Sequence, residues 1–403
     1  MAAGFGKREA FGRRPVETPA ARPQARATQA VPAAITQDGG PAALPSKWPL
    51  LTITLSVVLA TIFCIQTTFG LEPGQPLAFD LRTATAWGGI DRYLVIDQHE
   101  WWRIFTAPWL HASLDHLVGN LITLGIAGTI LERRIGAAWL AAVYFAGGLA
   151  GSIGSILLGN PTIVSIGASG AIMALVTALY ALSYHASLER NARRLRRFAL
   201  FVVVPAVVPS AAHSAMQIDV GAHFGGFVAG LAVAFLLLVV WGENQPAPGW
   251  RTPARGVAGF GVAAALACFA LVVLHYPSYA ARSAALVPLS RYHDEGTLVR
   301  DAYNLSLRYP HDPGLRMVLA ADSLTHRYYA DAESQARKGL EERDMLVTEF
   351  GPPVEQRLHL LLALALVSQH RQEEAKEAVQ PACELVNDNA ALAGDFHHLG
   401  LCV

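Results

Sequence analysis

Seven long apolar stretches, separated from one another by polar segments, occupy the sequence between residues 48 and 276. A bilayer core about 30 Å thick is crossed by roughly 20 apolar residues in a helix. The stretches are 48–66, 114–131, 137–158, 168–186, 198–216, 220–241 and 256–276. The pattern predicts seven membrane-spanning helices, and the last is the clearest because it has no charge in 21 residues.

Beyond residue 276 the apolar positions recur with helical periodicity, which is typical of amphipathic helices. The expected helices are 296–308, 314–326, 329–343, 355–369 and 372–387. Two segments align at an offset of 43 residues, so that Leu315 matches Leu358 and Ala320 matches Ala363. Paired helices of this kind resemble a tetratricopeptide array, whose usual period is about 34 residues. A plain helical hairpin domain is the alternative.

Positive charges are placed unevenly around the predicted spans. Residues 1–47 carry seven Lys or Arg and three acids, so the positive-inside rule places the N-terminus in the cytoplasm. Alternation puts the segments after the second, fourth and sixth spans on the same side. Those segments hold Arg133 and Arg134, then Arg190, Arg193, Arg194, Arg196 and Arg197, then Arg251 and Arg255. The C-terminal part is then extracytoplasmic, and the expected location is a bacterial inner (plasma) membrane.

Composition agrees with a membrane protein that carries a soluble part. Charged residues are 15% and hydrophobic residues 53% of the 403 positions, whereas soluble domains carry about 25% charged residues. This excludes an ordinary soluble enzyme, a disordered chain and a globally basic nucleic-acid binder. The 31 basic and 31 acidic side chains cancel, because the surplus of acids lies after residue 276.

The four cysteines exclude a disulfide-stapled scaffold. Cys64 and Cys268 lie in predicted spans, whereas Cys383 and Cys402 lie in the C-terminal part. The latter two can pair if that part is in an oxidising compartment.

The fold class expected from these patterns is all-α, with a polytopic membrane helix bundle and a soluble helical-repeat domain. Residues 1–46 form a disordered basic N-terminal tail, and 47–245 form a six-helix core. Residues 246–276 comprise a linker and a seventh span, and 277–403 form the soluble helical domain. That domain is expected to bind a protein partner or a second copy.

Few polar groups lie within the spans, where they are costly and usually functional. They are His116, Asn120, Ser169 and His223. Small residues next to them allow helices to approach closely; these are Gly167, Gly170, Gly226 and Gly230. The predicted topology places all the polar groups in the first turns of outside-to-inside helices, and therefore at one depth.

A serine, a histidine and hydrogen-bond donors at one level are what acyl transfer requires. A serine hydroxyl becomes nucleophilic when a base removes its proton, and His223 can be that base for Ser169. The tetrahedral oxyanion then needs fixed donors. His116, the Asn120 amide and the Ser169 backbone N–H can supply them.

At this point the sequence resembles the rhomboid family of intramembrane serine proteases, over about residues 48–241. The family's motifs are matched in order by Trp102-Arg103, by His116 and Asn120 with an upstream His111, by Glu132, Arg134 and Gly136, by Gly167 to Gly170, and by Ala222, His223, Gly226 and Gly230. The resemblance implies a Ser169–His223 dyad without a third acid. It implies cleavage of transmembrane protein substrates near the outer face of the bilayer, without cofactor or metal. One position departs from the family, since Met173 stands where many relatives place an aromatic that stacks on the catalytic histidine.

Other interpretations of the same residues remain open. Asp115 or Asp219 is a candidate third triad member, although Asp219 is better placed to cap the helix that follows it. A metal site from His111, His116 and Asp115 has an unsuitable spacing. Arg103, Glu132 and Arg134 are expected to anchor the structure.

Two alternatives concern the whole chain. The first is a non-catalytic relative of the rhomboid proteases that binds membrane helices, and the second is a transporter or channel. The latter is disfavoured because the spans lack a charge relay and a two-fold repeat of hydropathy.

Overall fold

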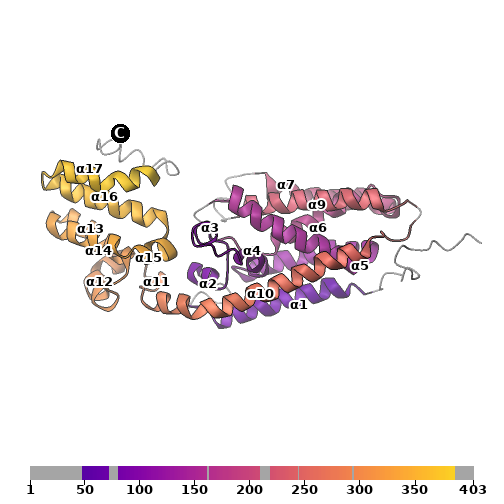
Figure 1. Ribbon diagram of the computed structural model, residues 1–403, viewed down its shortest axis with the longest axis horizontal. Coiled ribbons are helices and arrows are strands. Elements are labelled where there is room, and N and C mark those ends of the chain that lie inside the picture. Colours follow the sequence, from indigo (N-terminus) through magenta and orange to yellow (C-terminus); the bar gives the residue numbers. More distant parts are fainter. Residues whose placement is uncertain are drawn as a thin grey trace, which may run out of the picture. The chain divides into compact units, whose positions relative to one another are not determined.

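The structure is a computed structural model that describes residues 48–71, 80–160, 163–208, 218–243, 245–292 and 295–385. Within these ranges the chain forms helices joined by turns (Figure 1), and an isolated bridge between Ile90 and Ser165 is the only β-pairing. The all-α class predicted from the sequence is therefore confirmed. The predicted N-terminal tail, 1–46, lies outside the described residues.

The helices of the membrane-spanning region overlap the predicted apolar stretches, and residues 209–216 of the fifth stretch lie outside the described residues. The helices are α1 (Leu50–Thr68), α5 (Leu114–Leu158), α6 (Ser169–Leu182), α7 (Ala192–Val207), α9 (Val220–Val240) and α10 (Arg251–Ala284). Of these, α1, α5, α9 and α10 are long and apolar enough to cross a membrane. Helix α5 contains the second and third predicted spans. They are separated at Gly136, where φ 82° and ψ 163° break the helical backbone. Glycine alone adopts such a conformation at little cost.

Some helix ends differ from the prediction. Helix α7 begins at Ala192 instead of residue 198, and α10 runs through Pro277 to Ala284. The predicted boundary at residue 276 therefore lies inside α10. Hydropathy marks only the lipid-facing length of a helix, whereas backbone hydrogen bonds continue into polar sequence.

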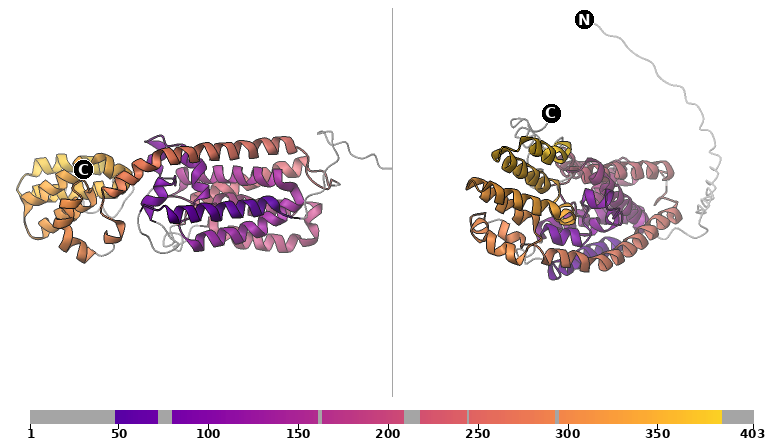
Figure 2. Two further views of the ribbon diagram at one scale, coloured as in Figure 1. Left: turned by 90° about the horizontal axis from the view of Figure 1, so that it is seen from below. Right: turned by 60° about the vertical axis from the view of Figure 1, so that its left-hand side comes forward.

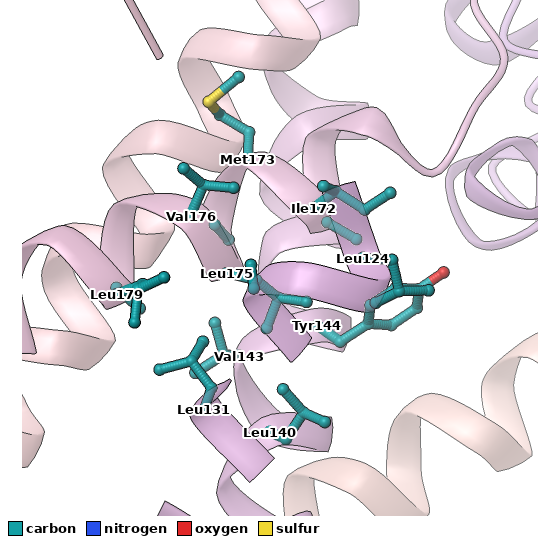
Figure 3. Close-up of a cluster of buried hydrophobic side chains, with 14 of the residues drawn as sticks. Leu124, Leu131, Leu140, Val143, Tyr144, Ile172, Met173, Leu175, Val176 and Leu179 are labelled. Carbon is teal, nitrogen blue, oxygen red and sulfur yellow. The ribbon is translucent and has the colours of Figure 1, made fainter. Parts of the chain in front are cut away.

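Helix α6 packs against both α5 and α9, and the long helices run side by side (Figure 2). Its side chains are almost all buried, including Leu175 and Leu179. Figure 3 shows the side chain of Leu175 near Tyr144 and Val143 of α5, whereas Met173 points away from Tyr144. A short helix enclosed in this way places its first residue, Ser169, within the bundle.

The start of α1 is held by a carboxylate from α5. Glu132 is buried and accepts hydrogen bonds from the backbone N–H groups of Leu51 and Thr52, both at 2.9 Å, and from the Thr52 hydroxyl at 2.7 Å. It thereby satisfies N–H groups that lack partners inside the helix. Arg134, two residues later, is exposed.

Between α1 and α5 the chain forms short helices. They are α2 (Leu81–Ala86), α3 (Arg92–Ile96), α4 (Arg103–Thr106) and η1 (Ala107–Trp109). Helix α10 packs against α2 and α4. The segment before the candidate site is therefore supported by the seventh span.

The C-terminal region is built from α11 (Leu289–Tyr292), α12 (Glu295–Arg308), α13 (Pro313–Thr325), α14 (Tyr329–Glu341), α15 (Arg343–Met345), η3 (Leu346–Phe350), α16 (Pro352–Ser368) and α17 (Gln372–Leu385). Helices α12, α13, α14, α16 and α17 match the five predicted helices closely. The aligned residues Leu315, Leu358, Ala320 and Ala363 are all fully buried. The region thus contains the helical hairpins α13–α14 and α16–α17, and the tetratricopeptide-like repeat stays a prediction.

Cysteine states follow the division of the chain. Cys383 in α17 is disulfide-bonded, whereas Cys64 and Cys268 are free thiols in α1 and α10. Cys402, its predicted partner, lies outside the described residues.

Candidate functional site

Ser169 is the first residue of α6 and lies two positions after Gly167, where a side chain would be strained and would meet His116. Gly167 has φ +132°, and a Cβ added to it would lie 2.7 Å from Cε1 and 2.9 Å from Nε2 of His116. The same position is 3.8 Å from Oγ of Ser169. His116 from α5 and the Ser169 hydroxyl therefore lie around Gly167, as the sequence motifs led us to expect.

The backbone at Ser169 starts a helix that has no side-chain cap. Ala168, at the N-cap of α6, makes no side-chain capping hydrogen bond. The first N–H groups of a helix have no intrahelical acceptor, and the helix dipole adds positive potential there. Such an end favours an anion, including a developing oxyanion.

His223 lies in the first turn of α9, which begins after a carboxylate cap. Asp219 accepts a hydrogen bond from the Ala222 N–H at 2.9 Å, so the capping role predicted for Asp219 is confirmed. The Nδ1 atom of His223 lies 3.0 Å from the backbone carbonyl oxygen of Ala206 in α7. A carbonyl oxygen only accepts, so Nδ1 is the donor, and the basic lone pair of the neutral imidazole is on Nε2.

The first turns of α6 and α9 are in direct backbone contact. A Cβ on Gly170 would lie 3.3 Å from the Ala222 carbonyl oxygen, and a Cβ on Gly226 would overlap the Gly170 backbone. One turn deeper, Gly230 meets the backbone of Ala174 in the same way. The contact thus joins the residue after Ser169 to the residue before His223. Ser169 and His223 are both half-buried.

Asn120 has a partner that the sequence did not indicate. Its side-chain amide nitrogen lies 3.0 Å from Nε2 of His111, and His111 is fully buried. The His111 ring also meets the His116 ring edge-on, with centroids 5.2 Å apart. The two histidines and Asn120 therefore form one cluster, and His116 is its member that lies against Gly167.

A small cavity of about 20 Å³ lies beside the loop that precedes α6. Its lining includes Ser152, Ser165, Gly167, Gly170 and Ala222. A cavity of this volume is large enough for one water molecule.

Trp102 and Arg103 anchor the segment that precedes the site. The Arg103 guanidinium is fully buried and donates to the carbonyl oxygens of Thr85 at 2.6 Å and Gly89 at 2.8 Å. It also pairs with Glu100 at 2.6 Å and donates to the Tyr279 hydroxyl at 2.7 Å. This arginine is saturated with structural partners, which agrees with the anchoring role expected for it.

Two features of the site were missed by sequence reasoning. The Ala206 carbonyl at His223 is a backbone atom, and no residue type reports it. The contact between His111 and Asn120 joins a loop residue to a helix residue nine positions later, which helical spacing alone does not predict. Met173 belongs to the buried core of the bundle.

Comparison with known proteins places residues 98–240 in the Rhomboid domain family. RHOMBOID-like protein 1 of Arabidopsis thaliana is 29% identical over 184 residues, covering 44% of this chain and 46% of the relative. Rhomboid protease GluP of Bacillus subtilis (strain 168) is 28% identical over 271 residues, covering 66% of this chain and 46% of the relative. Inactive RHOMBOID-like protein 8 of Arabidopsis thaliana is 39% identical over 95 residues, covering 23% of this chain and 27% of the relative.

The chain spans about half the length of the first of these relatives. The matched region, 98–240, contains the glycine at φ +132°, the contact between α6 and α9, and the histidine cluster. The family resemblance drawn from the motifs is therefore confirmed. Residues 98–240 form a domain of the rhomboid family, and this domain lies in the membrane-spanning helix bundle.

Proposed function

We propose that the protein is an intramembrane serine endopeptidase in which Ser169 is the nucleophile and His223 the general base. The observation that carries the proposal is the backbone contact between the first turns of α6 and α9, at Gly170, Ala222 and Gly226. This contact supports a short reach between the Ser169 hydroxyl and the His223 imidazole. Acyl transfer needs such a pair.

The reaction follows from the protonation states of the two residues. Nε2 of His223 takes the proton of the Ser169 hydroxyl as Oγ attacks the carbonyl carbon of the scissile peptide bond. The imidazolium then protonates the leaving amine, and an acyl-enzyme remains on Ser169. Water, deprotonated by the same imidazole, attacks the ester, and the acid product leaves with the serine proton restored.

The oxyanion formed in both steps lies nearest to the donors around Gly167. The Ser169 N–H is at the uncapped start of α6, and the His116 imidazole lies against Gly167. Asn120 completes the set through its second amide hydrogen, because one donor contacts His111. Each fixed donor contributes roughly 10²–10³ in rate.

The proposed substrates are transmembrane proteins, cut within or near the outer part of the bilayer. The distribution of Arg residues supports a cytoplasmic N-terminus and an extracytoplasmic C-terminal region. The disulfide at Cys383 supports the same location, because disulfides persist in oxidising compartments. We further propose a bacterial inner membrane and a partner-binding or self-associating role for 277–403.

Cleavage of a membrane-anchored reporter in a strain without the wild-type gene tests the activity. Ser169→Ala and His223→Ala should each reduce cleavage to below about one-thousandth of the wild-type rate. Ser183→Ala is the matched control, because Ser183 lies at the other end of α6 and donates to the Tyr180 carbonyl. Cleavage by either active-site variant at the rate of Ser183→Ala would contradict the proposal.

A non-catalytic membrane-helix binder is the second candidate, because a relative named as inactive is 39% identical over 95 residues. A fluorophosphonate probe separates the two functions, since it reacts only with an activated serine. The wild type and Ser183→Ala should be labelled and Ser169→Ala should not. No labelling of wild-type protein that still binds a transmembrane substrate would favour the binder.

Orientation is tested with single cysteines in a chain in which Cys64, Cys268, Cys383 and Cys402 are replaced by serine. Asn304→Cys on exposed α12 should react with a membrane-impermeant maleimide in intact cells. Arg194→Cys in the first turn of α7 should react only after permeabilisation. The opposite result would reverse the proposed topology.

A further inference from the structure

We infer that the backbone carbonyl of Ala206 is the third member of the proposed catalytic group and positions His223. This inference rests on the proposed function, because it assigns Ala206 a role only through the general base. The imidazole of His223 then donates to a peptide oxygen at the end of α7. Serine hydrolases with a triad use a carboxylate in this role.

The contact is a defined hydrogen bond between two helices. The Nδ1 atom of His223 on α9 lies 3.0 Å from the Ala206 oxygen on α7, across 17 positions of sequence. Helix α7 packs against both α6 and α9. The acceptor is therefore held by the same bundle that holds the nucleophile.

The Ala206 carbonyl is available because of its place in α7. Ala206 is the second-to-last residue of the helix, and the last four carbonyls of a helix have no intrahelical donor. The Val208 N–H, which follows the helix, bonds to the Val204 carbonyl and not to Ala206. The oxygen of Ala206 thus accepts from His223 without breaking the helical ladder.

The end of α7 also supplies a favourable potential. The C-terminus of a helix carries partial negative charge, which stabilises a cation placed there. His223 becomes such a cation each time it takes the proton of Ser169. The carbonyl and the helix end together perform the orienting and charge-stabilising work of a triad acid.

No carboxylate takes this role in the part of the chain that the structure describes. Asp219, the nearest candidate by sequence, accepts from the Ala222 N–H at 2.9 Å and caps α9. Asp115 is exposed in the first turn of α5. The donor on Nδ1 of His223 faces the Ala206 oxygen instead.

The tautomer of His223 provides a test that does not depend on turnover. Full-length protein with ¹⁵N-labelled histidine in lipid nanodiscs is measured by solid-state NMR, and the His223→Gln variant identifies the resonances. We expect Nδ1 to be protonated and Nε2 to be unprotonated, in the wild type and in Ser169→Ala alike. A neutral His223 protonated on Nε2 would overturn the inference.

An amide-to-ester substitution tests the effect on the reaction. Replacing Val207 by its α-hydroxy analogue turns the Ala206 carbonyl into an ester carbonyl, which is a weaker acceptor. The matched control places the α-hydroxy analogue at Val204, one turn earlier. Both changes remove one backbone N–H from α7, but only the first alters the partner of His223.

We expect the ester at 207 to lower kcat by about threefold to tenfold, with KM within about twofold of the control. Equal kcat values for the two esters would overturn the positioning role. A wild-type protein that binds substrate without cleaving it would instead overturn the proposed function, and the NMR result would still decide the contact.

Discussion

Helices α6 and α9 of the membrane-spanning region meet through glycine backbones, whereas the C-terminal helices meet through alanine and leucine side chains. In the first region, Gly226 lies against the backbone of Gly170. In the second, Ala320 and Leu362 fill a core in which both are buried. Water drives the second kind of packing by the hydrophobic effect. Lipid provides no such force, so membrane helices rely on close approach.

This difference predicts that an added side chain destabilises a contact between backbones more than a contact between side chains. Where backbones touch, an added Cβ has nowhere to move, because neither helix can yield without the other. Where side chains touch, a neighbour can adopt another rotamer.

Gly226→Val should have the largest effect. Its side chain would overlap the Gly170 backbone, so the first turns of α6 and α9 must separate, at a cost of more than about 3 kcal/mol. Thermal unfolding in nanodiscs and reporter cleavage should both show the loss. Gly125→Val on α5 is the matched control, since nothing lies within 4 Å of its Cβ position.

A glycine of the C-terminal region sharpens the same test. A Cβ on Gly339 would meet the methyl groups of Leu358 at 2.9 Å, and these can rotate away. Gly339→Ala should therefore cost less than Gly226→Ala. Equal losses would mean that backbone contact is not what distinguishes the two regions.

Leu362→Ala should destabilise the C-terminal region by about 3 kcal/mol, because it leaves a cavity in a water-driven core. Hydrogen exchange of the full-length chain should show lost protection in α14 and α16 and unchanged protection in α6 and α9. Leu307→Ala is the control, since Leu307 is 70% exposed. Lost protection in α6 would show that the two regions unfold together.

The helices of both regions were predictable because each kind of burial produces its own pattern of apolar residues along the sequence. Continuous apolar runs predicted the spans, and helical spacing of residues such as Leu315 and Leu358 predicted the C-terminal helices. The ends were less predictable. Helix α10 passes beyond residue 276 because its polar final turns, up to Ala284, make the same backbone bonds as its apolar ones.

The candidate site was predictable only as far as it consists of side chains. Ser169, His116 and His223 are conspicuous because polar groups are rare in spans. The Ala206 carbonyl and the Ser169 N–H are not, because every residue has a backbone. The capping role of Asp219 was found because a carboxylate at a helix start has a known physical reason.

Each region also contains one buried carboxylate that accepts three hydrogen bonds. Glu132 accepts from Leu51 and Thr52 at the start of α1. Asp312 accepts from the N–H groups of Val287 and Leu315, both at 2.8 Å, and from the Tyr292 hydroxyl at 2.7 Å. Both therefore hold a helix start to a distant segment.

Glu132→Gln and Asp312→Asn should each cost about 2 kcal/mol, because an amide replaces one acceptor by a donor that faces an N–H group. Thermal unfolding should show similar losses for the two variants. Exposed Glu341→Gln serves as the control for the C-terminal region. A much smaller loss for Asp312→Asn would mean that water replaces the missing acceptor there and cannot do so at Glu132.

Surface ion pairs of the C-terminal region should give the smallest effect. Arg371, in the turn between α16 and α17, pairs with Glu333 of α14 at 2.6 Å and with Glu374 of α17. Hydrogen bonding from Arg371 lowers the pKa of the Glu374 carboxyl. Exposed pairs of this kind contribute little and are screened by salt.

Arg371→Gln should therefore lower Tm only slightly at neutral pH. In about 0.5 M salt, which screens such pairs, Arg371→Gln should lower Tm no more than Lys376→Gln does. Because the pKa of Glu374 is lowered in the folded state, its ion pair stabilises the fold at pH values above the unfolded pKa. This contribution is lost as the pH falls through the folded pKa. The Tm difference between Arg371→Gln and the wild type should therefore vanish in acid. The Arg103–Glu100 pair of the membrane-spanning region is the counterpart, since Arg103 is fully buried. Its contribution should not respond to salt, and a salt response equal to that of Arg371 would contradict the distinction between the two regions.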